Sequence, residues 1–590
     1  MENIDQTWQD KKIRNLSSGL NVSKTGESIE DNQLTSCSNV IAYKDNVRSD
    51  TGYTPLGDSV IGTPRREYRF FKKDGTLFPI LITNLRFYVW NFIVGQWQAV
   101  SDGAASTTLS GTESIGQVVI GVADRTGFNP NDPIAIIRAD GTQHISTISS
   151  GYIATTGAGD ITIDDALTVA AAASDEFITV ASLSGSDDIQ ISLVSIPSDD
   201  LLIFTNGVDN LKVFDGDTCE DLAGIPASGD FQCRVVDLHE GHLLALNTTE
   251  AGVRYPQRVR NSDTFNFTEW SAGNAGFEDL YDTSDHITAS LQLGPYRIIY
   301  RERSIVRQEY VGSEDILFLR DTMFIGDGTL APEAVVDRKG SHIVFGNSGI
   351  YRYQGGFDIQ YLSDKVWHKI FSSSGELSPS AKNRSFGLYV EELGEVWFLY
   401  PITAEEYPTR MVRYQESTNS WFVRDFLIPI SGFGFFESRT VITWATATGT
   451  WIEATYPWNF SGLNSNAKIT HLLSSTVNRV YEYNYISSLD DTEDIPWFMD
   501  TKDFSDPDYH VRVDSITVLA RGNNVSVQYS IDQGSSWTSF NPISFSSSSL
   551  QEHTLHGQFV AERFRIRFSG TGSGFELSWI KFEVAKESGW

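Results

Sequence analysis

The chain has 590 residues, of which 76 are acidic and 45 are Lys or Arg, and its formal net charge is −31. This length exceeds what one hydrophobic core supports, so we expect several compact units. Aromatic residues make up 12% of the chain, which excludes an intrinsically disordered protein. The excess of carboxylates excludes nucleic-acid binding through phosphate contacts, which need Lys and Arg. The acidity indicates either a solubilising surface or a surface that repels a polyanion.

The cysteines and the N-terminus give no sign of export or membrane insertion. Cys37, Cys219 and Cys233 are odd in number and lack metal-site spacing, so we expect reduced or buried structural thiols. The first residues are polar, which predicts no signal peptide. The sequence contains no run of about 18 apolar residues, so we predict no transmembrane helix. We therefore expect a soluble protein made in a cytoplasm-like compartment.

The first two segments of the chain differ in pattern. Residues 1–55 are polar and irregular, which predicts an extended N-terminal arm. Residues 56–97 contain the apolar run 79–84, the aromatic run 87–90 and a closing Trp97. Short runs separated by turn residues predict strand, turn and strand. We interpret 56–97 as the first unit of a repeated array.

The composition shifts over residues 98–196. The segment has no Trp, its basic residues are Arg125 and Arg138 alone, and Ala, Thr, Ser, Gly and Asp dominate. Short β-branched runs predict strands, and Asp140-Gly141 is a hairpin turn signal between two of them. We therefore predict an inserted small β-barrel or sandwich.

The pattern of the first unit returns over residues 197–494. Each copy has an apolar strand, a polar turn and an aromatic alternating strand; the copies are 201–216, 296–310, 342–356, 396–414 and 470–483. Such a hairpin cannot bury its apolar face alone, and a recurrence of about 45 to 60 residues is typical of propeller blades. We predict about five to seven blades; the alternative is a chain of unrelated β-sandwiches.

Residues 495–590 form the last predicted unit. Four alternating apolar runs near 511–518, 525–529, 564–568 and 575–580 predict antiparallel strands of a C-terminal β-sandwich. The predicted fold class is thus all-β, with a β-propeller core, an inserted small β-barrel domain and a C-terminal β-sandwich.

One motif of the last unit matches a known turn. Residues 530–537, Ser-Ile-Asp-Gln-Gly-Ser-Ser-Trp, have the Asp-box pattern S-x-D-x-G-x-x-W. In such a turn we expect Asp532 to bind backbone amides, Gly534 to adopt a positive φ and Trp537 to pack the turn onto the sheet. The pattern resembles the Asp-boxes of sialidase propellers, where it is structural, and we interpret it as structural here.

Three other clusters contain residue types used in catalysis or metal binding. His239-Glu240-Gly241-His242 lacks the helical i, i+4 spacing of H-E-x-x-H, so we interpret it as a turn. The acidic run 490–494 is interpreted as a solvated linker rather than a calcium site. Six arginines are interpreted as outward charge pairs rather than a sialidase triad: Arg254, Arg258, Arg260, Arg297, Arg301 and Arg303. We therefore predict a protein that is not an enzyme, with no catalytic, cofactor-binding or metal-binding residue.

The order of several short phrases resembles the tail nozzle proteins of short-tailed bacteriophages, also called tail tubular protein B or packaged-DNA stabilisation proteins. The phrases are Gly19-Leu20-Asn21, Asp31-Asn32-Gln33, Asn39-Val40, Thr205-Asn206-Gly207, Val213-Phe214-Asp215-Gly216, Arg258-Val259-Arg260-Asn261-Ser262, Phe267, Trp270, Glu302-Arg303-Ser304-Ile305, Val311-Gly312, Gly326-Asp327-Gly328-Thr329-Leu330-Ala331-Pro332, Gly349-Ile350-Tyr351-Arg352-Tyr353 and Ser530-Ile531-Asp532-Gln533-Gly534. They cover about 20–55 and 200–590, and 98–196 departs from the pattern.

The resemblance implies a structural protein of the virion, synthesised in the host cytoplasm. Such proteins are similar in forming a homo-oligomeric ring, usually a hexamer, that adjoins the portal and adaptor ring and other tail proteins. The ring continues the DNA channel, helps retain the packaged genome and permits its ejection. Double-stranded DNA would pass through the lumen without specific binding, because a carboxylate-lined wall repels phosphates. We expect the propeller's own channel to be too narrow for a duplex.

Two other functions remain open from the residues alone. The Asp-box and the aromatic content favour a glycan-binding or sialidase-like β-propeller. An extracellular β-adhesin is the third possibility, but it should carry a signal peptide or paired cysteines. A sialidase should bring arginines and carboxylates together in one pocket.

Overall fold

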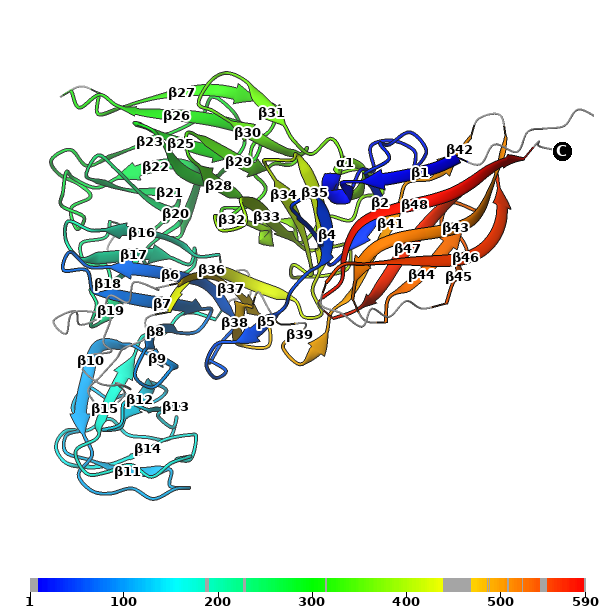
Figure 1. Cartoon of the computed structure of the whole chain (residues 1–590). Coiled ribbons are helices and arrows are strands. Elements are labelled where there is room, and N and C mark those ends of the chain that lie inside the picture. Colours follow the sequence, from blue (N-terminus) through cyan, green and yellow to red (C-terminus); the bar gives the residue numbers. More distant parts are fainter. Residues whose placement is uncertain are drawn as a thin grey trace, which may run out of the picture.

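The computed structural model describes residues 9–185, 190–226, 230–313, 316–438, 468–484, 487, 489–506, 509–522, 524–541, 549–572 and 574–587. The protein is built from strands, as predicted. In the described residues, helix is confined to the short α1 (Trp367–Ile370) and two 3₁₀ turns, Leu16–Ser18 and Lys382–Arg384. Figure 1 shows a central propeller, an inserted domain below it and a C-terminal sandwich beside it.

The described residues contain seven blades, which we name A to G in chain order of their innermost strands. Blades A to C consist of β6 (Pro64–Phe71), β7 (Leu77–Thr83), β8 (Phe87–Asn91) and β9 (Gln96–Ala99); β16 (Ser192–Ile196), β17 (Leu201–Thr205), β18 (Lys212–Phe214) and β19 (Cys219–Asp221); and β20 (Phe231–His239), β21 (His242–Glu250), β22 (Val253–Asn261) and β23 (Gly276–Asp279). Each blade is a four-stranded antiparallel meander.

Blades D to G follow the same plan. They consist of β24 (Ile287–Leu293), β25 (Tyr296–Arg301), β26 (Ser304–Tyr310) and β27 (Phe318–Ile325); β28 (Val335–Arg338), β29 (Ser341–Phe345), β30 (Ile350–Tyr353) and β31 (Ile359–Tyr361); β32 (Phe386–Val390), β33 (Glu395–Tyr400), β34 (Arg410–Gln415) and β35 (Ser420–Asp425); and β36 (Ile430–Ser438), β37 (Lys468–Ser475), β38 (Arg479–Tyr483) and β5 (Tyr53–Pro55). The predicted propeller core is thus confirmed, with seven blades.

Apolar side chains between neighbouring blades close the ring. The second strands β7, β21, β29 and β33 are buried on both faces because a blade packs on each side, which explains their continuous apolar runs. A hydrophobic cluster joins every pair of neighbours around the ring, including A to B, F to G and G to A. Phe386 of blade F stacks on Phe433 of blade G with ring centroids 4.7 Å apart.

Two pairings from distant parts of the chain complete the closure. The innermost strand β36 of blade G pairs in parallel with β6 of blade A through Phe433 and Arg66. Strand β5, from the N-terminal segment, pairs antiparallel with β38 and forms the outer strand of blade G. The first and last parts of the propeller therefore hold each other in place.

The inserted domain projects from blade A (Figure 1). Its sheets are β10 (Ser101–Thr108), β15 (Glu176–Val180), β12 (Pro133–Ile137) and β13 (Gln143–Thr147), and the pair β11 (Val119–Val122) and β14 (Gly159–Thr162). They enclose their own core, in which Phe128 contacts Phe177. The structure differs from the predicted range 98–196 at its end, because β16 (192–196) pairs with β17 and belongs to blade B. The residues of β16, Ser-Leu-Val-Ser-Ile, resemble the insert in composition, so no change in composition marks this boundary.

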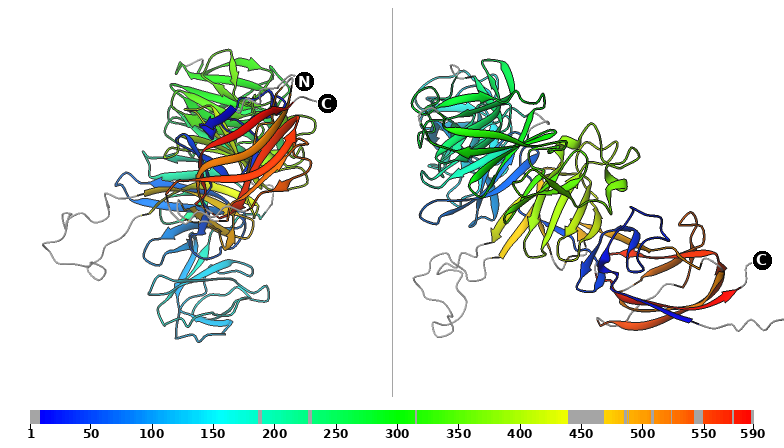
Figure 2. Two further views of the ribbon diagram at one scale, coloured as in Figure 1. Left: turned by 45° about the vertical axis from the view of Figure 1, so that its right-hand side comes forward. Right: turned by 90° about the horizontal axis from the view of Figure 1, so that it is seen from above.

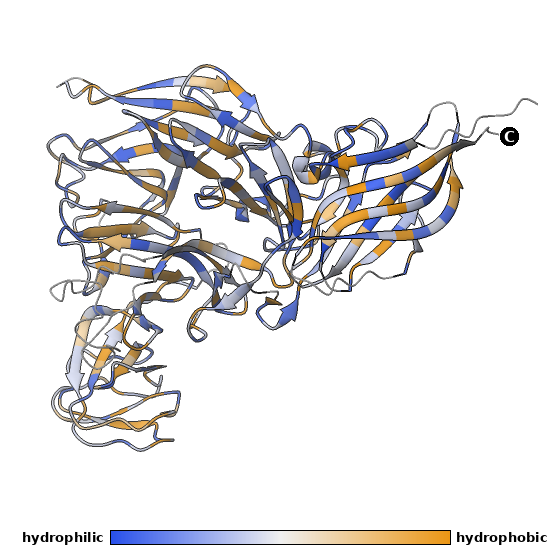
Figure 3. Cartoon of the chain, viewed as in Figure 1, coloured by the Kyte–Doolittle hydropathy of each residue, from blue (hydrophilic) through white to orange (hydrophobic). Residues whose placement is uncertain are grey.

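The C-terminal β-sandwich has two sheets, in agreement with the predicted class. Its strands are β41 (Pro496–Thr501), β42 (Phe504–Ser505), β43 (His510–Arg521), β44 (Ser526–Ser530), β45 (Thr538–Ser539), β46 (Gln551–Ala561), β47 (Arg563–Thr571) and β48 (Glu576–Glu587), joined by β1 (Gln9–Arg14), β2 (Leu34–Ser38), β3 (Val40–Tyr43) and β4 (Asn46–Ser49). In Figure 3 hydrophobic and hydrophilic residues alternate along its strands.

The N-terminal strands correct the prediction of an extended arm over residues 1–55. Strands β1, β3 and β4 enter one sheet of the sandwich, β2 enters the other, and β5 enters the propeller. Figure 2 shows these strands, in blue, beside the orange and red C-terminal strands. Strand β3 pairs with the adjacent β4, but β1, β2, β4 and β5 have partners more than 400 residues away in sequence, so the local pattern of three to six residues carried no sign of those pairings.

Candidate functional site

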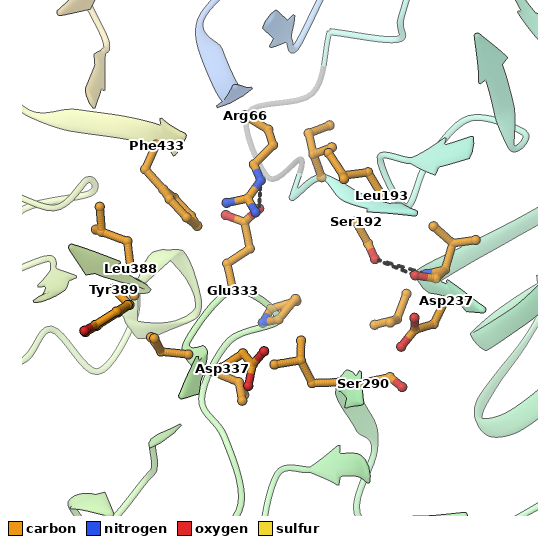
Figure 4. A pocket seen from close by; sticks show the side chains of 18 of the residues that line it. Arg66, Ser192, Leu193, Asp237, Ser290, Glu333, Asp337, Leu388, Tyr389 and Phe433 are labelled. Carbon is orange, nitrogen blue, oxygen red and sulfur yellow. Dashed lines mark hydrogen bonds and ion pairs between the residues drawn. The ribbon is translucent and has the colours of Figure 1, made fainter. Parts of the chain in front are cut away.

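The central channel of the propeller is the first candidate site. Its cavity of about 380 Å³ is lined by the innermost strands of all seven blades. Figure 4 shows its polar side chains: Arg66 and Glu333 lie together on one side, and Asp237 and Ser290 lie on the other. Such concave, largely apolar cavities with a few convergent polar groups are the usual ligand sites of proteins.

Two ion pairs cross the wall of this channel. Nη2 of Arg297 lies 2.9 Å from Oδ1 of Asp237, and Nε of Arg66 lies 3.8 Å from Oε1 of Glu333. Burial raises the pKa of Glu333 to about 7, although Arg66 opposes the shift. Burial likewise raises the pKa of Asp237 above its ordinary value against the attraction of Arg297. Both carboxyls therefore lie where water does not fully compensate their charge.

The rest of the channel wall is mainly apolar. The Arg66 guanidinium lies over the Phe433 ring, 4.0 Å from its centroid. Leu388 and Tyr389 of β32 lie on the same side as Phe433 (Figure 4), and the exposed Asp337 adds a further carboxylate. The cavity thus combines apolar wall residues with paired charges, and the two faces of the Phe433 ring are covered by Arg66 and Phe386.

The second candidate is a buried ionic cluster where the propeller meets the N-terminal segment. Oδ2 of Asp50, which follows β4, lies 2.6 Å from Nη1 of Arg413 and 2.7 Å from Nη1 of Arg424. Arg413 also pairs with Glu395 at 2.8 Å, and Arg424 pairs with Asp490 at 2.6 Å. Burial acts to raise the pKa of Asp50, but the two guanidiniums hold it well below its ordinary value. All five side chains are buried, which indicates a structural clasp rather than a substrate site.

The Asp-box forms the predicted turn, between β44 and β45. Asp532 accepts hydrogen bonds from the backbone amide of Ser536 at 2.8 Å and from its hydroxyl at 2.6 Å. These bonds lower the pKa of Asp532 to about 2. Gly534 has a φ of +90°. Trp537 packs under the Arg567 guanidinium, 4.0 Å from the ring centroid, so this Trp reaches the sheet through a cation–π contact.

The two histidines near 240 flank a hairpin turn, as predicted. His239 and His242 are paired residues at the ends of β20 and β21. Their ring nitrogens contact Gln308 and the carbonyl of Ser262, each at 2.9 Å. Among the described residues, no group of three His, Cys, Asp or Glu side chains is arranged to hold a metal ion.

The acidic run 490–494 is not simply a solvated linker. It contains the hairpin of β39 (Leu489–Asp490) and β40 (Glu493–Asp494), which lies beside β5. Asp490 is 6% exposed because it pairs with Arg424, whereas Asp494 is exposed. The prediction of a solvated linker was therefore wrong for Asp490. In the sequence this residue looks like a surface acid, because the buried Arg424 that pairs with it lies 66 residues away.

Four of the six arginines form charge pairs, as predicted, but three of these four are buried rather than outward: Arg258, Arg297 and Arg301. Arg254 and Arg303 are exposed. Arg258 makes two hydrogen bonds of 2.8 Å to Asp279, and Arg260 pairs with Glu250 at 2.8 Å. Arg301 is 0% exposed. Bidentate and buried pairs of this kind hold strands and loops of blades C and D together. They do not converge on one pocket, as a sialidase triad would.

Of the polar channel residues, the sequence interpretation named Arg297, as an outward charge pair, and did not select Arg66, Asp237 or Glu333. Asp237 interrupts the buried strand Val235-Val236-Asp237-Leu238. A lone charge within an apolar strand is the signal that could have identified Asp237, because such a charge is rarely buried without a partner. Cys37, Cys219 and Cys233 are free and buried, as predicted.

Comparison with known proteins gives no match among family models or curated sequences and distant matches among solved structures. No family model and no curated protein matches the chain. Raptor from Chaetomium thermophilum is 7% identical, with 74% of this chain and 30% of that chain covered and a TM-score of 0.25. Hsv2 from Kluyveromyces lactis is 10% identical, with coverages of 61% and 97% and a TM-score of 0.24. An exo-β-1,3-galactanase from Phanerochaete chrysosporium is 9% identical, with coverages of 84% and 98% and a TM-score of 0.22.

The chain therefore spans 30% of the length of the Raptor structure. No helix in the described part of the chain is both long and apolar enough to cross a bilayer.

Proposed function

We propose that the chain is a virion structural protein that forms an oligomeric tail nozzle in a short-tailed bacteriophage. In this proposal a ring of subunits, a hexamer by the resemblance, continues the DNA channel below the portal and adaptor ring, helps retain the packaged genome and permits its ejection. The observation that carries the proposal is the collinear order of the phrases between Gly19 and Gly534.

Several of these phrases lie at turns where the backbone conformation and close contacts permit few residue types. In Gly326–Pro332, Asp327 is buried and accepts amide hydrogen bonds from Asn347 and Ser348 at 2.9 and 3.1 Å. A Cβ at Gly328 would lie 1.9 Å from the carbonyl oxygen of Arg301. These requirements explain why such phrases would recur in proteins that share this fold, and they support the proposed relationship.

The size of the propeller channel supports a DNA path between subunits rather than within one. Its cavity of about 380 Å³ is crossed by ion pairs and lined by side chains from every blade. A B-form duplex is ~20 Å wide, given the dimensions of its grooves. A duplex-wide pore therefore has to be enclosed by several copies of the chain.

The net charge of −31 indicates how DNA would pass through such a pore without binding to it. Carboxylates repel phosphates, so DNA slides past on water and counterions, whereas each lysine would bind a phosphate and release counterions. The inserted domain has a strongly acidic surface; its exposed acids include Asp124, Asp140, Asp160, Asp164, Asp165 and Glu176. This makes the projecting domain a suitable wall element.

Electron microscopy of the purified full chain tests the proposal. The expected result is a closed ring, six-fold by the resemblance, with a pore of ~20 Å. A chain that stays monomeric at all concentrations and in tail preparations would overturn it, as would cleavage of a sialoside reporter by that monomer.

A second test uses the carboxylates that the ring places on its pore. Their replacement by Lys should slow DNA ejection, because each lysine adds a phosphate contact. The matched Asn or Gln variants remove the same charge without adding a contact, and their ejection should stay close to the original rate. Equal ejection rates in the Lys and amide variants would contradict the repulsion mechanism.

A further inference from the structure

A groove of about 690 Å³ separates the outer strands of blade A from the inserted domain. Blade A lines it with Phe78 and Phe92, and the inserted domain lines it with Ile137 and Ile178. Figure 1 shows β8 and β9 next to β10, β12 and β15 at this junction. Ile93, which also lines the groove, is 85% exposed. Open apolar surface of this kind indicates a place where another part of a protein packs.

The charge of the lining limits what this occupant is. The charged residues that line the groove are Glu176 and Asp217, and both are exposed. The other polar lining residues are Asn, Gln, Ser and Thr, which are neutral. Two carboxylates repel an anionic group, and a second copy of a chain with a net charge of −31 brings further carboxylates. The groove therefore fits an apolar occupant with almost no charge.

Residues 439–467 of the chain have this chemistry, and we call them the β36–β37 segment because they join β36 to β37. They lie outside the described residues. Their sequence contains one acid and one base, Glu453 and Arg439, whereas the whole chain is strongly acidic. Leaving apolar area in water costs about 25 cal/mol per Å², so such a segment gains free energy from an apolar partner. Its large aromatic residues are Trp444, Trp451, Tyr456, Trp458 and Phe460.

Both ends of the β36–β37 segment lie beside the groove. Ser438 and Lys468 are paired residues at the ends of β36 and β37, so the segment leaves and re-enters blade G at one point. Phe436, two residues before that point, contacts Phe92 and Trp90, which line the groove; the ring centroids are 6.2 and 5.4 Å apart. An extended chain rises ~3.3 Å per residue, so a segment of this length reaches ~45 Å and returns. The groove is therefore within reach of the aromatic residues of the segment.

We propose that the β36–β37 segment of the same chain docks in the groove and buries aromatic side chains there. The inserted domain already contacts the propeller through one hydrophobic cluster, in which Ala135 and Val180 pack with Trp90 and Trp97. The docked segment adds a second contact, so it helps to hold the acidic domain in its place beside blade A. The segment and the groove belong to one chain, so failure of this proposal would leave the proposed nozzle untouched.

Thiol labelling of Ile93→Cys in the full chain tests the proposal. The three native cysteines are buried, so they contribute little background. Ile325→Cys is the matched control, because Ile325 is 68% exposed and lies on β27 of blade D, which does not adjoin the groove. We expect Ile93→Cys to react about tenfold more slowly than Ile325→Cys, because the segment has to leave the groove before the reagent enters. Equal rates would overturn the proposal. Slow labelling that appears only at high protein concentration would assign the groove to a second copy and would overturn it too.

Replacement of Trp444, Trp451 and Trp458 by Ser locates the protection in the segment. It should raise the labelling rate of Ile93→Cys about tenfold and leave that of Ile325→Cys unchanged. Slow labelling of the native cysteines in the same variant shows that the fold is intact. An unchanged rate at Ile93→Cys would contradict the assignment.

Photo-crosslinking needs no change in the segment itself. p-Benzoylphenylalanine in place of Ile93 should form cross-links to residues 439–467 within one chain, whereas the same group in place of Ile325 should not. Mass spectrometry of the monomer band identifies the linked peptides. Cross-links from position 93 that never reach 439–467, or that reach it only in a dimer band, would refute docking within the chain.

Discussion

Glu67 should make the stability of the propeller depend on pH. Its carboxyl is 2% exposed at the seam where blade G meets blade A, and it accepts a hydrogen bond from the Ser474 hydroxyl. Its second oxygen has no partner. Burial raises the pKa of Glu67 from the ordinary 4.5 to about 7, and the nearby charge of Glu333 contributes in the same direction.

The sign and size of the effect follow from linkage. The unfolded chain releases this proton near pH 4.5, whereas the folded chain keeps it to about pH 7. Between these values the folded state binds more protons, so the free energy of unfolding falls as the pH rises, and above about pH 7 no further loss occurs. The difference between 4.5 and about 7 corresponds to about 3 kcal/mol for one carboxyl.

The variant Glu67→Gln removes this term while it keeps an acceptor for Ser474. We expect the variant to be up to about 3 kcal/mol more stable than the original chain at pH 8, and to differ much less at pH 5. Urea unfolding monitored by tryptophan fluorescence at both pH values measures this. Glu552→Gln, the same change at an exposed position of β46, is the control and should show little change. A Glu67→Gln variant that is equally destabilised at both pH values would refute the reasoning. Some pH dependence should remain from Glu333.

Three other predictions concern the closure of the fold. Asp50→Ala leaves two buried guanidiniums without their shared partner and should cost about 3 to 5 kcal/mol in urea unfolding, whereas Asp494→Ala should cost little; equal losses would contradict the clasp. Gly434→Ala places a Cβ 2.2 Å from the carbonyl oxygen of Glu67 and should lower the melting temperature or prevent folding, whereas Gly356→Ala, with open space, should be near neutral. The three buried cysteines should resist thiol reagents at pH 8 until the chain unfolds, because burial raises their pKa values; rapid labelling of the native chain would contradict their burial.

The local residue pattern predicted those features of the fold, hairpins and turns, that depend on local interactions. Strand hairpins such as 342–356 were predictable because alternation and turn residues specify a hairpin without knowledge of its partner. The Asp-box turn was predictable for the same reason, since Asp532 and Ser536 are four residues apart. Of the candidate site, Arg297 was named, as an outward charge pair, and an isolated charge within an apolar strand, such as Asp237, could have been noticed.

The tertiary structure decided how these hairpins are joined. Whether β5 belongs to an arm or to blade G depends on β38, which is more than 400 residues away, and a three-residue strand fits either role. The clasp likewise gathers Asp50, Arg413 and Asp490 from three distant segments. Amino-acid sequence by itself therefore determined an acidic all-β chain of repeated hairpins. The number of blades, the closure of the ring and the contents of its channel follow from long-range packing, because burial and ion pairing depend on neighbours that local periodicity does not encode.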